Sequence, residues 1–442
     1  MKKIVFLLMV FVLMMALIPG VLAAAPAPGG PFKTEFYVQN LEATNAKCTY
    51  AFYTAAGVAA YTSSEVTILP GDKLRVYTPD IATLAAGEYS GVVSCDKKVA
   101  ATVNFSDPNS GAAFNGVDTP STVFYAPAIY DNYYGYFSNI YIQNASTSPV
   151  NITVDIYAAG GAVPVKTQTA TAVPAYAAVH FEQEGLAELA NNVAYSAKIT
   201  GTGDLAAIVN IYGGTGEDQL YSYTAYASGG VVAYAPLIMN GYYGYNTSMT
   251  IQNLGTETAN VTVDYTGPST VTNNYTIGPN SSLAIYSPNV VPINATHSYA
   301  AKVTSTNSKP IVVLVNESVI GGLQAASYDG FVAGSNEVRI PVVMKNYYTF
   351  NTSINCQNVG TAATTFTISY AGVAGSTTSP SLLPGAKAEI YQPSDPILAA
   401  VPANWSSSAT IISSGQPLVC VVNESSGTVA GDQLYSFNGV AP

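Results

Sequence analysis

The chain has 442 residues, of which 48% are hydrophobic and only 9% are charged, and its formal net charge is −11. This composition excludes a disordered chain, because disordered chains combine high charge with low hydrophobicity. The acidic balance also argues against nucleic acid or anionic lipid as a partner, since both need a basic patch.

The N-terminus has the layout of a secretory signal peptide over residues 1–23. Two lysines precede an uncharged apolar run from Ile4 to Ile18, and small residues lead to an expected cleavage near Ala23. The run is shorter than the roughly 20 residues that a membrane span needs, although a retained anchor is the alternative. We therefore expect a secreted chain at the extracellular cell surface, with no membrane span after signal removal.

Downstream of the signal peptide, four landmarks recur at a nearly constant step, which defines a tandem repeat. A Gln-Asn pair closes a strand four times, at steps of 104, 109 and 105 residues. A turn proline and an Asn at the end of an apolar strand recur with similar steps, and a Tyr-rich phrase opens three of the units. The Gln-Asn pairs are Gln39-Asn40, Gln143-Asn144, Gln252-Asn253 and Gln357-Asn358.

Each repeat has about 105 residues and predicts seven or eight short β-strands. In the third repeat we expect strands near 234–239, 247–253, 259–266, 271–277, 282–287, 298–305, 310–316 and 325–331. This strand number favours an immunoglobulin-like sandwich, and a closed barrel per repeat is the alternative. We therefore predict an all-β chain of four sandwiches arranged as beads on a string, with repeats at 24–122, 123–232, 233–337 and 338–442.

The first repeat departs from this pattern because it opens directly at a strand equivalent to the second strand of the other units. It lacks the leading strand and the Tyr-rich turn. A sandwich without this strand exposes unpaired backbone along one edge. We hypothesise that another subunit or partner supplies a strand there by β-augmentation.

The four cysteines lie in the two terminal repeats. In an exported chain, two cysteines per domain most simply form the disulfides Cys48–Cys95 and Cys356–Cys420. Metal binding is a poor alternative, because no pair has CxxC spacing and no histidine flanks them.

The sequence contains no motif that predicts catalysis, a cofactor or a metal site. His180 does not recur in the other repeats and is expected to be a partly exposed strand residue, and His297 lies in a loop with no acidic partner nearby in sequence. Acidic residues in the phrases GEDQLYSY and GDQLYSF favour a polar hairpin over a Ca²⁺ site. We therefore expect a non-enzymatic protein.

Two features suggest recognition or modification. Asn-x-Ser/Thr sequons are dense, and glycans on them would keep so uncharged a surface soluble; the alternative is that these residues only form turns. The sequons are Asn104, Asn144, Asn151, Asn246, Asn260, Asn274, Asn280, Asn294, Asn316, Asn351, Asn404 and Asn423.

Tyrosines cluster in the turn after the leading strand of three repeats. They could stack on sugar rings, or pack against a neighbouring domain or subunit, where tyrosine is favoured for its apolar body and hydroxyl tip. The second use is favoured because the cluster recurs beside each linker. The residues concerned are Tyr133, Tyr134, Tyr136, Tyr242, Tyr243, Tyr245, Tyr347 and Tyr348.

The phrase RIPVVMKNYYTFNTSINCQNVG and the repeat layout resemble tandem immunoglobulin-like-repeat proteins of prokaryotic cell surfaces, of the S-layer, sheath and adhesin kind. The resemblance implies a structural component of a layer, sheath or filament that packs against copies of itself or other surface proteins. The alternative is an adhesin or carbohydrate-binding module that holds polysaccharide with its Tyr-rich loops. The resemblance carries no site residues over.

Overall fold

The computed structural model describes residues 30–214 and 219–442. The described chain is all β, with antiparallel strands joined by turns and by short 3₁₀ helices at Thr78–Asp80, Ser287–Asn289, Gln392–Ser394 and Pro396–Leu398. The expected all-β class is confirmed. The signal-peptide prediction and the acidic pair at 217–218 lie outside the described residues. No helix within the described ranges is long and apolar enough to cross a membrane.

Each repeat has two sheets, which we call the axial sheet and the outer sheet; the axial sheet contains the last strand of the repeat. In the first repeat the axial sheet has the order β5-β1-β7-β8, and in the outer sheet β2 pairs with β3, β4 and β6. The strands are β1 Lys33–Asn40, β2 Ala46–Tyr53, β3 Ala59–Thr62, β4 Val66–Ile68, β5 Lys73–Tyr77, β6 Ser90–Cys95, β7 Val99–Ser106 and β8 Gly111–Asn115.

The second repeat contains one long strand, β14, that belongs to both of its sheets. The N-terminal half of β14 pairs with β9 and β11, and its C-terminal half pairs with β10 and β15. The strands are β9 Ser121–Tyr130, β10 Tyr136–Asn144, β11 Val150–Ala158, β12 Lys166–Val173, β13 Ala178–Glu182, β14 Ala194–Gly213 and β15 Gln219–Thr224.

The third and fourth repeats share one strand plan, in which β20-β17-β22-β23 and β28-β25-β30-β31 are the axial sheets. The third repeat has β16 Val232–Tyr242, β17 Tyr245–Asn253, β18 Ala259–Thr266, β19 Thr270–Ile277, β20 Ser282–Tyr286, β21 His297–Ser305, β22 Ile311–Val319 and β23 Ala325–Asp329. The fourth repeat has β24 Glu337–Lys345, β25 Phe350–Asn358, β26 Phe366–Tyr370, β27 Thr377–Thr378, β28 Lys387–Tyr391, β29 Trp405–Ser413, β30 Leu418–Ser426 and β31 Leu434–Asn438.

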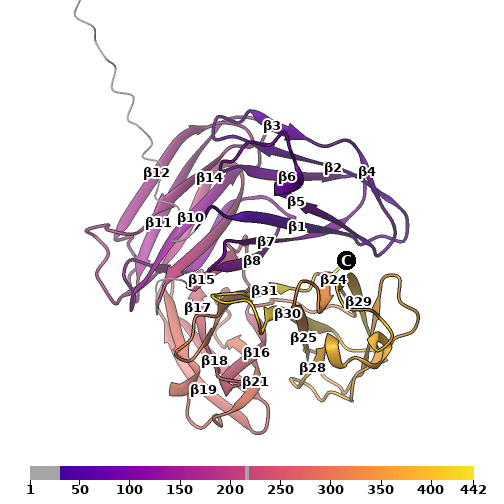
Figure 1. Ribbon diagram of the computed structural model, residues 1–442. Helices are drawn as coiled ribbons and strands as arrows, with labels where there is room; N and C mark the ends of the chain where they lie inside the picture. Colours follow the sequence, from indigo (N-terminus) through magenta and orange to yellow (C-terminus); the bar gives the residue numbers. More distant parts are fainter. Residues whose placement is uncertain (1–29, 215–218) are drawn as a thin grey trace, which may run out of the picture.

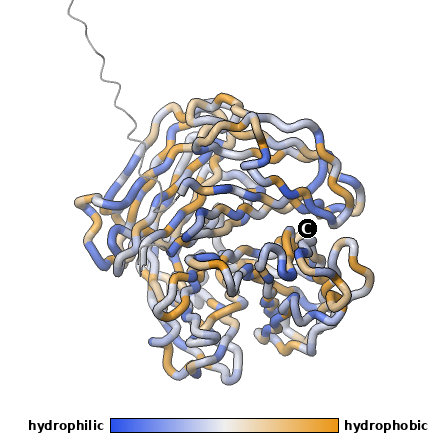
Figure 2. Tube along the Cα trace, viewed as in Figure 1, coloured by the Kyte–Doolittle hydropathy of each residue, from blue (hydrophilic) through white to orange (hydrophobic). Residues whose placement is uncertain are grey.

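All eight strands expected in the third repeat are present, with ends displaced by at most three residues. The first strands of repeats two to four begin at Ser121, Val232 and Glu337, one or two residues before the expected boundaries. Apolar and polar residues alternate along many of these strands (Figure 2), which places one set of side chains inside each repeat.

The four repeats do not form beads on a string; they close into a ring around a common axis (Figure 1). The last strand of each repeat contacts the last strand of the next, in the order β8, β15, β23, β31 and back to β8. Every residue of β15, β23 and β31 except the last is buried, so these strands cannot serve as exposed sheet edges. Burying these edges against one another removes the unpaired surfaces that separate beads would expose.

Polar side chains join the last strands at one end of this axis. Asn438 donates from Nδ2 to the carbonyl of Asp329 at 2.6 Å and accepts from its amide at Oδ1 at 3.1 Å. Asn115 donates from Nδ2 to the carbonyl of Asn438 at 2.9 Å, and the Thr224 hydroxyl donates to the carbonyl of Asn115 at 2.7 Å. A backbone hydrogen bond of Thr224 to the Asp329 carboxyl group closes the set, so residues from all four repeats form one hydrogen-bonded circuit.

Both residues of each Gln-Asn pair have a structural role. The Asn side chain closes a turn within its own repeat, as Asn253 does by donating to the carbonyls of Glu257 and Ile277. The Gln side chain reaches the preceding repeat around the ring, as Gln252 does by donating to the carbonyl of Ala197 at 3.2 Å. Gln39 and Gln357 make the same contact with the carbonyls of Ala409 and Ala301.

Both expected disulfides are present, Cys48–Cys95 and Cys356–Cys420. The first joins β2 to β6 in the outer sheet of the first repeat, and the second joins β25 to β30 in the axial sheet of the fourth. Two structural disulfides are typical of a chain that folds in an oxidising compartment.

Candidate functional site

The tyrosine clusters form two-residue hairpin turns between the leading strand and the next strand. In the second repeat, Tyr133 and Tyr136 exchange both backbone hydrogen bonds, at 2.8 and 3.0 Å. Tyr134 lies between them with φ of 52°, and its equivalents Tyr243 and Tyr348 have φ of 49° and 46°. Asn or Gly normally fills this left-handed position, and a bulky side chain there is an outlier.

The three left-handed tyrosines are also the most exposed aromatic residues of their turns. Tyr134, Tyr243 and Tyr348 have 73, 81 and 70% of their surface exposed. The strain of the turn and the exposure of the ring recur together in three repeats. A turn that keeps an exposed ring in an unfavourable backbone conformation indicates a role for the side chain.

The remaining tyrosines of the clusters make packing contacts. Tyr136 and Tyr245 hydrogen-bond Gln219 and Gln324, at or beside the last strand of their own repeats. Tyr242 reaches the fourth repeat, where its hydroxyl donates to Glu389 Oε2 at 3.2 Å. Each turn therefore lies at the boundary between its own repeat and the next one around the ring.

A groove with a volume of about 650 Å³ opens between the second and third repeats. Its walls are the tyrosine turn of the second repeat and strands β20 and β22 of the third. The lining residues include Tyr130, Tyr133, Tyr134, Tyr136, Ile211, Ser248, Tyr275, Ala284, Tyr286, Asn289, Asn316 and Ser318. No charged side chain of the described residues lines it.

Three boundaries of the ring have a tyrosine turn, and at this one two positions of β20 carry short, uncharged side chains where the other two boundaries have charged ones. At the same strand positions of the third repeat lie Ser282 and Ala284, opposite Gln252 and Thr250. The fourth repeat has Lys387 and Glu389 there, and the first has Lys73 and Arg75. Ala284 lines the groove, so a side chain that would fill it is truncated at this position.

At the boundary between the third and fourth repeats, long side chains fill the space that is equivalent to the groove. Lys387 Nζ donates to Asn355 Oδ1 at 2.7 Å, and Glu317 of the third repeat accepts from Asn423 Nδ2 at 2.7 Å. Burial lowers the pKa of Lys387 to about 8 and raises that of Glu317 to about 8. Long ionisable side chains thus occupy the space that is open at the groove.

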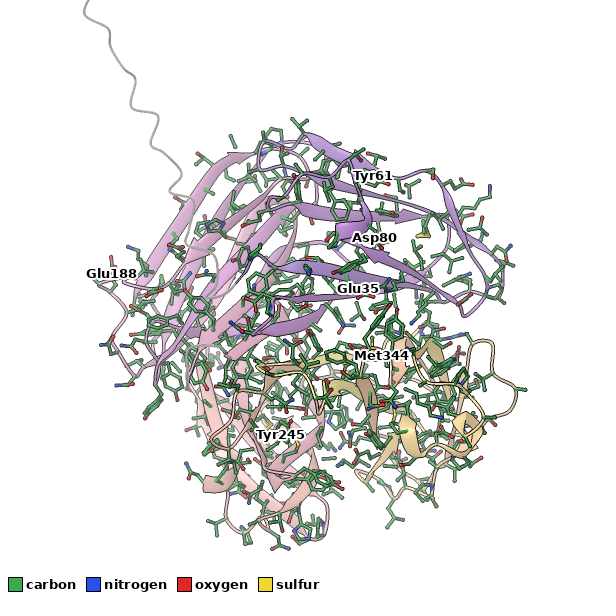
Figure 3. The ribbon with its side chains drawn as sticks, in the orientation of Figure 1. Glu35, Tyr61, Asp80, Glu188, Tyr245 and Met344 are labelled. Atoms are coloured by element: carbon green, nitrogen blue, oxygen red, sulfur yellow. A yellow bond between two sulfur atoms is a disulfide. The ribbon has the colours of Figure 1, made fainter. Side chains whose placement is uncertain are left out.

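The boundary between the fourth and first repeats is filled in the same way. Asn104 Nδ2 donates to Glu424 Oε2 at 2.7 Å, and Lys73 donates to the carbonyl of Ser407 at 3.1 Å. Arg75 pairs with Glu35. Glu35 on β1 and Met344 on β24 lie on the facing sides of the two repeats (Figure 3).

Asn316 gives the groove a directed donor. It is equivalent to Asn104 and Asn423, whose Nδ2 atoms bind glutamates of the preceding repeat. The residue in the glutamate position is Ile211, so Asn316 Nδ2 has no hydrogen-bond partner among the described residues. Its Oδ1 accepts from the Ser327 hydroxyl at 2.8 Å, which fixes the orientation of the amide.

Aromatic rings stand on both sides of the groove. Tyr134 is exposed on the second-repeat side, and Tyr286, 44% exposed, ends β20 on the other. The Tyr286 hydroxyl accepts from Asn246 Nδ2 at 2.8 Å. The Tyr130 and Tyr133 rings stack behind Tyr134 at 4.8 Å, which supports the turn.

The sequons divide by burial. Asn151, Asn260, Asn274, Asn294 and Asn404 are exposed, and Asn104, Asn280, Asn316, Asn351 and Asn423 are half-buried. Asn144 and Asn246 are buried, with their amide nitrogens donating hydrogen bonds inside the protein.

The histidines do not form a site. His180 is half-buried beside Glu88 of the first repeat at 3.6 Å, and a hydrogen bond to that carboxylate raises the pKa of His180. His297 is exposed on β21. Asp432 accepts from the amides of Leu220 and Ala325, which makes it a link between repeats. No group of potential metal ligands occurs in the described part of the chain.

No family model matches the chain, and no curated protein matches it. One solved structure, described as that of Thermotoga maritima 1070, is 22% identical over 24% of this chain and 96% of its own length, with a TM-score of 0.21. An anti-sigma factor domain-containing protein is 9% identical over 64% of this chain and 96% of its own length, with a TM-score of 0.09.

Proposed function

We propose that this protein is an exported, non-catalytic binding protein that holds a neutral carbohydrate in the groove between its second and third repeats. The observation that carries the proposal is the open, uncharged, tyrosine-lined space at a boundary whose two counterparts are filled by charged side chains.

The aromatic walls suit a sugar ring. The face of a tyrosine ring carries negative charge density, which attracts the C–H groups on the apolar face of a pyranose. Tyr134 and Tyr286 offer such faces from opposite sides of the groove. The hydroxyls and the Asn316 amide supply hydrogen bonds to sugar hydroxyl groups.

The size and neutrality of the groove narrow the ligand class. A volume of about 650 Å³ lies within the roughly 300–1,000 Å³ of small-molecule sites, which accommodates a short oligosaccharide. A charged ligand would find no side chain of opposite charge in the groove, so the free energy cost of removing its hydration shell would not be compensated. Neutral saccharides therefore fit better than uronic acids or phosphates.

A glycan array followed by calorimetry with the best ligand tests the proposal. Tyr134→Ala and Tyr286→Ala should each weaken binding at least tenfold. A double variant, Ser282→Lys with Ala284→Glu, transplants the pair of the fourth repeat and should abolish binding by filling the groove.

The matched control is Tyr243→Ala, which removes an equally exposed ring at a filled boundary and should leave binding unchanged. An array without neutral ligands would reject the proposal. Equal losses from Tyr134→Ala and Tyr243→Ala would place binding on the exposed turns and outside the groove.

We also infer that the four units are immunoglobulin-like sandwiches and that the protein acts outside the cell. The two-sheet strand plan, the alternating core positions and the two disulfides support this inference. Sequencing the N-terminus of the protein purified from its native source tests the export of the chain.

A second candidate function is a structural component of a surface layer, sheath or filament. The tyrosine turns, which were expected to pack against a neighbouring domain or subunit, lie at boundaries between repeats of one chain. The specific observation that favours assembly is the incomplete first repeat. Electron microscopy of the native cell surface would reveal an ordered array.

A further inference from the structure

The leading strand has the same two contacts in the three repeats that possess it. β9, β16 and β24 each pair antiparallel with a strand of their own outer sheet, namely β14, β21 and β29. Each also lies over the axial sheet of the next repeat: β9 over β17 and β22, β16 over β25 and β30, and β24 over β1 and β7. The leading strand thus completes one sandwich and covers another.

The first repeat has no strand in this position within the described residues. Its β6 pairs with β2 alone. The vacant place, which we call the β6 slot, lies between β6 and the axial sheet of the second repeat. The axial sheet of the second repeat forms the floor of the β6 slot. The equivalent surfaces of the sheets that contain β1, β17 and β25 are each covered by a leading strand.

Residues at the floor of the β6 slot are less buried than their equivalents in the other repeats, as expected if no leading strand covers them. Tyr141 on β10 is half-buried, whereas its equivalents Tyr37, Thr250 and Asn355 are 0, 1 and 2% exposed. Gln143 is half-buried as well and donates to Tyr176 in its own repeat, whereas the other three glutamines of the landmark reach the preceding repeat.

Residues on the β6 side of the slot are also less buried than their equivalents. Val93 of β6 is half-buried and Gly91 is exposed, whereas their equivalents in β21, Val303 and Ala301, are both 0% exposed. The core cluster of the first repeat is also the smallest of the four main clusters in the described chain. Apolar surface that other repeats bury under a leading strand is therefore left partly open.

The free edge of β6 can be read from its register with β2. Cys48 and Cys95 are directly opposite, with Cα atoms 4.1 Å apart. That spacing identifies a non-hydrogen-bonded antiparallel pair, whose N–H and C=O groups point away from the partner strand. Because the pattern alternates, Gly91, Val93 and Cys95 present their backbone groups to the β6 slot.

The three existing leading strands specify what fits. They have 9 to 11 residues, are buried along most of their length, and carry a proline near the middle, at Pro127, Pro236 and Pro341. The pairing register shifts beside each proline, so its missing N–H costs no ladder hydrogen bond.

We propose that the β6 slot accepts an extended apolar strand from a separate polypeptide, antiparallel to β6, with a proline near its middle and hydrophobic residues on both faces. The strand adds to the outer sheet of the first repeat by β-augmentation and covers Tyr141 and Gln143 of the second. A strand then lies over the axial sheet at all four boundaries of the ring.

Fluorescence anisotropy with a labelled peptide of the β24 sequence, EVRIPVVMK, tests the proposal on the full chain. The peptide should bind saturably, and a scrambled peptide of the same composition should not. Val93→Pro should weaken binding at least tenfold, because it removes an edge N–H that does not take part in the β2 ladder. Val93→Thr, which retains the N–H, is the matched control.

Thermal unfolding without peptide checks that Val93→Pro still folds. Self-association that Val93→Pro and excess peptide both abolish would support the proposal, with a second copy as the source of the strand. Absence of saturable peptide binding to a monomeric chain would overturn it. Equal affinity of the Val93→Pro variant would overturn it as well.

Discussion

Asn423 Nδ2 donates a 2.7 Å hydrogen bond to Oε2 of Glu317 across the boundary between the third and fourth repeats. Both Glu317 and its equivalent Glu424 are almost wholly buried, and the second carboxylate oxygen of each has no partner among the described residues. Two carboxyls are thus kept in an environment that favours their protonated form.

This arrangement makes stability depend on pH. Burial raises the pKa of Glu317 and Glu424 to about 8 and that of Asp329 to about 7. A carboxyl with a raised folded pKa stabilises the fold fully below its unfolded pKa, and this stability is lost as pH rises toward the folded value. The free energy of unfolding should therefore fall between pH 5 and 7, by up to about 1.4 kcal/mol per pH unit for each carboxyl.

Urea unfolding at pH 5, 6 and 7 measures this slope, and Glu317→Gln should reduce it because the amide does not titrate. Lys73 and Lys387, whose pKa values burial lowers to about 7 and about 8, act mainly at higher pH and do not interfere. A slope that the substitution leaves unchanged would contradict the assignment.

The circuit at the ring axis should hold the four repeats together. Asn438→Ala removes two side-chain hydrogen bonds to Asp329 and should cost about 2–3 kcal/mol of unfolding free energy, because the backbone groups left behind are partly buried. Guanidinium unfolding measures the loss. A surface control is Asn307→Ala, whose amide bonds an exposed carbonyl; an equal effect of both changes would argue against a special role of the axis.

Replacing a glutamine that bonds the preceding repeat should cost more stability than replacing the one that bonds only its own repeat. Gln252→Ala removes the bond to Ala197 and should cost about 1 kcal/mol. Gln143→Ala should cost less, because the Gln143 side chain is half-buried and makes no bond to the first repeat. Paired thermal unfolding compares the two variants directly, and a larger loss for Gln143→Ala would be inconsistent with the ring contacts.

Sequon occupancy should follow exposure in a host that N-glycosylates secreted proteins. Asn151 and Asn260 are exposed at equivalent positions of β11 and β18 and should carry glycans. Asn144 and Asn246 should not, because their amide nitrogens are already committed to buried hydrogen bonds. Peptide mass spectrometry after enzymatic deglycosylation distinguishes the two pairs.

Much of the local structure follows from the sequence, because strand period and turn residues are local signals. The strands of the third repeat, the two disulfides and the missing first strand were all predictable. The ring was not, because contacts between repeats leave no period of their own. One signal was present: the phrases LYSYT and LYSFN lack an exposed polar face, unlike an edge strand.

The groove could be found from the sequence only by comparing equivalent positions. The positions equivalent to His180 in the other repeats hold Arg75, Ala284 and Glu389, so the sequence already contains the small residue that opens the groove. That this small residue opens a groove follows only once the strand is known to face the preceding repeat. Ile211, in the position of Glu317 and Glu424, was missed for the same reason.

The covalent linkage of the four units has a consequence for stoichiometry. A symmetric tetramer of identical subunits repeats every boundary, so any cleft that it opens appears four times. Within one chain, each boundary can diverge independently, as the charged, neutral and incomplete boundaries of this ring have done. The chain can therefore have a neutral groove at one boundary and a vacant strand position at another, each once per molecule, while the two charged boundaries hold the ring closed.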